Sequence, residues 1–154
     1  MNCAIFTTPS FKDFESVTVG LLKHYPSSDP NDHLFCQFQG IVSPAGMHLK
    51  VLAFEVETGP KSCFVIELSG SGRAMRIIAD HTGNFEGAEG LSPKWLMGGD
   101  LQGEYWGASF LIPASLLAEL TEGDKLWGNV SKYKQNIMDC SLFSQEMGIF
   151  HILQ

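Results

Sequence analysis

Basic residues are scarce in this chain. Only 18% of its 154 residues are charged, and 10 Lys and Arg face 17 Asp and Glu, for a formal net charge of -7. An acidic surface repels phosphate backbones and anionic lipid headgroups, so we expect neither a nucleic-acid nor a membrane partner. The sequence also lacks an apolar run of the roughly 18 residues that a membrane-spanning helix requires.

The sequence lacks the spacings that mark common catalytic and metal sites. Its four cysteines show no CxxC pair, and its five histidines show no HxH or HExxH pattern, which disfavours a zinc site. It contains no GxSxG elbow and no P-loop. We therefore expect a protein that is not an enzyme and needs no cofactor. Calcium is left open but not favoured, and the acids that could contribute are Asp29, Asp32, Asp100 and Glu104.

The start of the chain lacks the basic and apolar regions of a secretion signal. This favours a cytoplasmic location, while an extracellular one is left open. In a reducing compartment cysteines stay unpaired, so we expect four free and mostly buried thiols.

Turn residues are frequent, with 16 Gly and 7 Pro, and they separate short segments of alternating polarity. Strands are expected at 34–41, 47–56, 62–68, 73–79, 105–112, 126–133, 137–143 and 148–153, with a further short strand near residue 95. Residues 1–33 are expected to be the least regular part, and 26–32, 42–46 and 58–61 to be turns. The pattern predicts one all-β domain over 1–154, an antiparallel β-sandwich of two sheets with a jelly-roll-like topology.

The clearest local signal is GEYWGASFLIPASLL, residues 103–117. A strand-like run stops at Pro113 and gives way to a helical pattern over 114–120. Gly123 follows the last apolar residue, where a helix commonly ends. We therefore expect one short helix directly after Pro113.

Four segments, taken in order, resemble one family. They are KSCFVIEL at 61–68, RIIADHTG at 76–83, WGASFLIP at 106–113 and WGNVSK at 127–132. Together they resemble the family 9 carbohydrate-binding modules and their relatives in the DOMON-like β-sandwich group, over roughly residues 34–154. The resemblance implies a lectin-like β-sandwich. Lys61, Arg76, Ile78 and Ser109 stand where that family usually has an acidic residue or an asparagine. The resemblance therefore supports the fold better than it supports the family's usual sugar or calcium site.

Tryptophans are the first candidates for a ligand site, because the apolar face of a sugar ring packs on a flat indole. Trp95 lies in a polar, glycine-rich stretch, and Trp127 shares a strand face with Asn129. Trp106 is expected in the core, because Phe110 falls on the same face. The predicted ligand-binding residues are Trp95, Trp127, Asn129, Lys132, Arg76 and Asp80.

Three readings follow from these observations. The leading one is a non-catalytic carbohydrate-binding domain that stacks a saccharide on an exposed tryptophan. The alternative is a divergent β-sandwich that acts as a protein interaction or assembly module, as a homodimer or with another protein, and binds no sugar. A third reading is a small enzyme that uses Asp80 and His81 in a loop pocket.

Overall fold

The computed structural model describes residues 2–24, 35–55, 62–70, 72–87, 90–100, 103–135, 137–143 and 147–154. These residues form twelve strands and one helix. The strands are β1 (Asn2–Thr7), β2 (Val19–His24), β3 (Phe35–Ser43), β4 (Gly46–Phe54), β5 (Cys63–Ser69), β6 (Ala74–Asp80), β7 (Phe85–Glu86), β8 (Lys94–Asp100), β9 (Gly103–Pro113), β10 (Lys125–Lys134), β11 (Ile137–Ser141) and β12 (Gly148–Leu153), and the helix is α1 (Ala114–Leu120).

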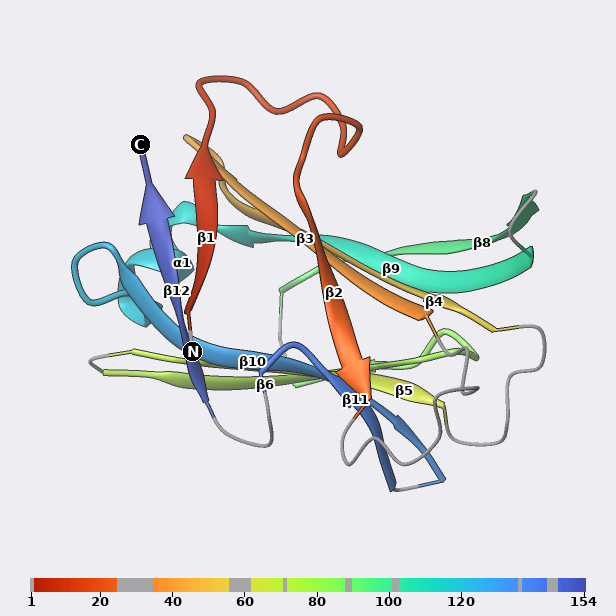
Figure 1. Ribbon diagram of the computed structural model, residues 1–154. Helices are drawn as coiled ribbons and strands as arrows, with labels where there is room; N and C mark the ends of the chain where they lie inside the picture. The colour runs from red at the N-terminus through yellow and green to blue at the C-terminus, as the bar shows by residue number, and fades with distance from the viewer. Residues whose placement is uncertain are drawn as a thin grey trace.

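The strands lie in two layers (Figure 1). One layer holds β2, β3, β4, β9 and β8, and the other holds β10, β5 and β6. The order β7-β6-β5-β10-β11-β2-β3-β4-β9-β8 is continuous, so the two layers are halves of one curled sheet. β1 pairs in parallel with β12 and β3, which makes the sheet mixed. The predicted all-β sandwich is confirmed, and its jelly-roll-like detail stays a prediction.

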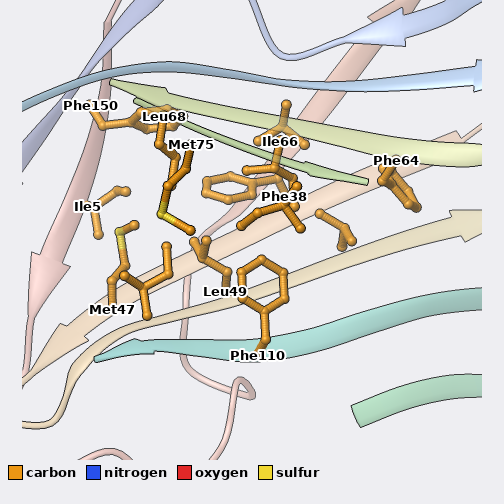
Figure 2. Packing of buried hydrophobic residues seen from close by; sticks show 14 of the residues in the cluster. Ile5, Phe38, Met47, Leu49, Phe64, Ile66, Leu68, Met75, Phe110 and Phe150 are labelled. Carbon is orange, nitrogen blue, oxygen red and sulfur yellow. The ribbon is translucent and has the colours of Figure 1, made fainter. Parts of the chain in front are cut away.

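Alternating side chains fill the space between the layers. On β9, Trp106, Phe110 and Ile112 point inward and are at most 5% exposed. Figure 2 shows Phe110 and Leu49 from one layer close to residues such as Ile66 from the other. Burying one such side chain stabilises the fold by about 1.5–3 kcal/mol. The core position predicted for Trp106 is therefore confirmed.

The helix predicted after Pro113 spans Ala114–Leu120, as the sequence indicates. Its Leu117 and Leu120 are buried against the core. The turn predicted at 42–46 is tighter than expected, because β3 runs to Ser43 and β4 begins at Gly46. Gly46 has φ +136°, and a Cβ there would lie 2.0 Å from the Ile112 carbonyl oxygen, so only glycine fits this turn.

The N-terminal part is more regular than expected, since β1 and β2 both lie within residues 1–33. β1 pairs with β12, at the other end of the chain. Because its partner is so distant in sequence, no local pattern predicts this strand. The strand expected near residue 95 is confirmed as β8. The turns predicted at 26–32 and 58–61 lie outside the described residues.

All four cysteines are free, as expected. Cys36 and Cys140 are buried, and Cys3 and Cys63 are half-buried. No helix in the described ranges is long and apolar enough to cross a membrane.

Candidate functional site

The six predicted ligand residues separate into three environments. Trp127, Asn129, Arg76 and Asp80 belong to β10 and β6, on the face turned away from the core. The register aligns Asn129 with Glu67 of β5 and Glu67 with Arg76, so these three side chains form a row across the layer. Trp127 is half-buried and Arg76 is exposed. Trp95 and Lys132 lie elsewhere, so the structure does not bring the six together.

Asn129 is 5% exposed and serves as a structural amide. Its Nδ2 donates to Ser141 Oγ at 2.8 Å and to the Phe143 carbonyl at 3.2 Å. Its Oδ1 accepts the backbone N–H groups of Val130 at 2.9 Å and Phe143 at 3.0 Å. These bonds fasten the segment after β11 to β10, and they occupy the donor and acceptor groups that a ligand would need.

Lys132 lies in the core rather than at a ligand-facing surface. Its side chain is fully buried and forms an ion pair with Glu55, which is 2% exposed. The other Glu55 oxygen accepts the indole N–H of Trp106 at 2.6 Å. Strand alternation explains the placement, because Lys132 shares the inward face of Val130. A buried charge is tolerated only with such a partner. The sequence analysis did not identify Glu55 as the partner of Lys132. The one local indication is that Glu55 directly follows the apolar residues of β4.

Trp95 lines a cleft at the open edge of the sandwich, with a volume of about 240 Å³. Its lining residues are His81, Thr82, Gly83, Trp95, Leu96, Met97, Trp106 and Gly107. The half-buried Trp95 ring meets Phe85 edge-on, with centroids 6.4 Å apart. No hydrogen bond joins the Trp95 Nε1 to another described residue, which leaves this donor for a ligand. Trp106, held from behind by Glu55 and Lys132, contributes a second indole to the lining.

Asp80 shapes the wall of this cleft. Its Oδ1 accepts Thr82 N at 2.9 Å, Thr82 Oγ1 at 2.7 Å and Asn84 N at 3.0 Å, and its Oδ2 accepts Asn84 Nδ2 at 2.9 Å. Burial raises the pKa of Asp80, but these hydrogen bonds together outweigh burial and hold its pKa below the ordinary value. The carboxylate therefore fixes the turn 81–84 against Trp95, and its oxygens are already engaged.

His81 contributes a polar imidazole ring to the lining of the cleft. Its Nδ1 lies 3.2 Å from the Ser62 carbonyl, which can only accept, so Nδ1 carries the proton and Nε2 of a neutral ring accepts. No hydrogen bond joins His81 to Asp80 within the described ranges, so the two do not form an acid–imidazole pair. In the same ranges no three His, Cys, Asp or Glu side chains gather as metal ligands, and Asp29 and Asp32 lie outside them.

Comparison with known proteins bears on the fold. No protein-family profile and no curated protein sequence matches this chain. Among solved structures, a family 9 carbohydrate-binding module from Caldicellulosiruptor kristjanssonii in complex with cellotriose has a TM-score of 0.70 at 8% identity, and the match covers 99% of this chain and 94% of that one.

Two further structures agree. A family 9 module from the same organism, in complex with glucose, has a TM-score of 0.66 at 7% identity, with 99% of this chain and 95% of that chain covered. A candidate carbohydrate-binding protein from Bacteroides uniformis has a TM-score of 0.65 at 12% identity, with 98% of each chain covered. The chain therefore has the fold of the family 9 carbohydrate-binding modules, as its sequence resemblance predicts.

Proposed function

We propose that this protein is a non-catalytic carbohydrate-binding domain that stacks one sugar ring on Trp95 in the cleft at the sandwich edge. The observation that carries the proposal is the half-buried indole of Trp95 in a cleft of about 240 Å³, with its N–H unengaged by the described residues. The fold shared with modules whose structures hold cellotriose and glucose supports the same ligand class.

The size of the cleft favours a single ring. Pockets that enclose drug-sized ligands measure about 300–1,000 Å³, so this smaller, open cleft suits one sugar unit of a longer chain. His81 Nε2 and the Trp95 N–H supply an acceptor and a donor for hydroxyl groups. One stacked ring and a few hydrogen bonds provide about 4–8 kcal/mol of binding free energy, which corresponds to millimolar to micromolar affinity.

The binding mode involves no chemistry on the sugar. A glycosidase generally needs two carboxyl groups flanking the scissile bond. None of the eight residues that line this cleft carries a carboxyl group, and the neighbouring Asp80 is committed to Thr82 and Asn84.

Calorimetry of the purified protein against glucose, cellotriose and xylotriose, with and without calcium, tests the proposal. We expect saturable binding that Trp95→Ala reduces at least about fivefold, if stacking of one sugar ring is comparable to the roughly 1–3 kcal/mol of a base stacked on an aromatic side chain. Trp127→Ala is the matched control, because Trp127 is equally half-buried but lies on β10, away from the cleft. A flat response to every sugar, or binding that only Trp127→Ala abolishes, would refute the proposal.

One observation favours the alternative reading as an interaction module. Phe6, Val19 and Leu21 are 51%, 41% and 50% exposed. Phe6 and Val19 both line a cleft beside β3, which is separate from the Trp95 cleft. Exposed apolar side chains grouped in this way are typical of protein-binding surfaces. Sedimentation analysis would favour this reading if it showed a stable dimer that Phe6→Ser together with Leu21→Ser dissociates. A monomer at all concentrations would count against self-association.

A further inference from the structure

A second groove lies on the opposite side of β8 from the Trp95 cleft. Its floor follows one row of side chains across five adjacent strands, on the face of the sheet turned away from the core. The register aligns, in order, Val19 of β2, Gln39 of β3, Lys50 of β4, Ser109 of β9 and Lys94 of β8. Residues directly opposite in an antiparallel ladder point to the same face, so the five side chains stand side by side.

One wall of this groove is the segment 11–15, and four contacts hold this segment and the nearby Val17 against the sheet. Gln39 Nε2 donates to the Phe14 carbonyl at 3.0 Å and to the Val17 carbonyl at 2.8 Å. The Phe11 ring stacks on His48 with centroids 3.9 Å apart. Lys50 Nζ lies 5.7 Å from the centre of the Phe14 ring. The groove has a volume of about 570 Å³, and Lys94 and Leu96 border it on the β8 side.

The two lysines of the floor have no counter-ion among the residues that the structure describes. Neither Lys50 nor Lys94 forms an ion pair with any residue of the described ranges. They flank Ser109 on neighbouring strands, so their backbones are about 10 Å apart at the usual strand spacing. Two uncompensated ammonium groups in a groove attract anionic groups. Asp13 and Glu15 line the groove at the opposite wall, so the positive charge is concentrated along the floor.

The remaining lining suits a sugar rather than a bare anion. Gln37 and Ser109 offer an amide and a hydroxyl, and Phe14 and Leu96 offer apolar surface, which is the combination that sugar hydroxyls and C–H faces require. A nucleic-acid backbone binds through many basic contacts, whereas only Lys12, Lys50 and Lys94 supply positive charge among the described residues that line this groove. Two ammonium groups on strands about 10 Å apart suit a short ligand with a few spaced carboxylates.

We infer that this lysine groove, lined by Phe14, Gln37, Lys50, Lys94, Leu96 and Ser109, binds an acidic oligosaccharide built of uronic-acid units. The site is separate from the Trp95 cleft, and Leu96 alone lines both. The inference goes beyond the proposed function, because it assigns a second ligand class to a different face of the sheet.

Calorimetry with trigalacturonate as the probe and cellotriose as the neutral control tests the inference. We expect binding of trigalacturonate that falls about tenfold in Lys94→Gln and again in the Lys50→Gln, Lys94→Gln double variant, since each substitution removes one charge-assisted hydrogen bond to a carboxylate. Lys125→Gln, at an exposed position on β10 in the other layer, should bind like the wild type. Binding should also weaken as salt is raised.

Two further measurements distinguish loss of the lysine groove from loss of the Trp95 cleft and from misfolding. Trp95→Ala should retain trigalacturonate binding, so that failure of the cleft and failure of the groove can be told apart. Melting curves should show that Lys94→Gln folds normally, because its side chain is exposed. The inference is overturned if trigalacturonate does not bind, if both lysine variants bind it like the wild type, if Trp95→Ala abolishes it, or if a short poly-glutamate peptide binds equally well.

Discussion

Lys132→Met should be among the most destabilising substitutions available in this protein. The change keeps the length of the side chain but removes the ammonium group that neutralises Glu55. Both partners are almost completely buried, at 0% and 2% exposure, so water cannot replace the lost charge. Breaking a buried pair on one side costs about 3–5 kcal/mol, because the remaining charge is left uncompensated.

This cost is large relative to the stability of a domain of this size. Folding free energies are typically about 5–15 kcal/mol, so the variant would lose roughly a fifth or more of the usual total. At roughly 2–4 °C per kcal/mol for about 150 residues, the melting temperature should fall by roughly 6–20 °C. Urea unfolding followed by circular dichroism measures the free energy of unfolding directly.

A double-mutant cycle separates the interaction energy of the Lys132–Glu55 ion pair from the energy lost through poorer packing. Glu55→Gln removes the charge while retaining an acceptor for the Trp106 N–H. The double variant should be less destabilised than Lys132→Met alone, with a coupling energy of about 0.5–3 kcal/mol. Lys125→Met on the same strand is the control and should change stability by about 0.5 kcal/mol or less, because Lys125 is exposed. A loss below about 1 kcal/mol for Lys132→Met, or strictly additive losses in the cycle, would refute the reasoning.

Two further predictions concern a thiol pair and a histidine. A hydrogen bond with Cys140, together with burial, raises the pKa of Cys36. Cys36 and Cys140 are both buried, so they should react with a disulfide reagent only after unfolding, whereas the half-buried Cys3 and Cys63 should react earlier. Reaction of all four thiols at one fast rate in the native protein would contradict this. Burial lowers the pKa of His48, which stacks on Phe11. The neutral ring is favoured in the folded state, so this stability contribution is intact above about pH 6.5 and is lost as pH falls through the lowered folded-state pKa. His48→Gln should flatten the stability profile in that range, and an unchanged profile would rule His48 out as its source.

Much of the fold could be predicted from local patterns. Alternating polarity placed most strands within one or two residues of their observed ends, and the Pro113 boundary placed the helix at 114–120. The missed strands were β1, β2 and the two-residue β7, which pairs with β6. β1 depends on pairing with β12 and β3, and β2 depends on pairing with β3 and β11.

The candidate site was less accessible to sequence analysis. Alternation along β10 correctly predicted that Asn129 and Lys132 point to opposite faces, because the direction of a side chain depends only on its position in its own strand. It could not show that Asn129 would be enclosed by the segment at Phe143 or that Lys132 would meet Glu55, since those partners lie on other strands. Trp95, chosen from the sequence, does line a cleft. Asp80 does not line it, but its hydrogen bonds hold the turn that contributes Thr82 and Gly83 to the lining.

Local sequence patterns are enough to predict which residues alternate, where the chain turns and where its one described helix begins, because these depend on neighbours along the chain. Which strands lie side by side depends instead on contacts between distant segments. That choice set Trp95 against the turn after Asp80 and aligned Lys50, Ser109 and Lys94 in one row. The physical reason is that strand register results from packing one whole sheet face against another, so contacts between distant segments exist only once the core has formed.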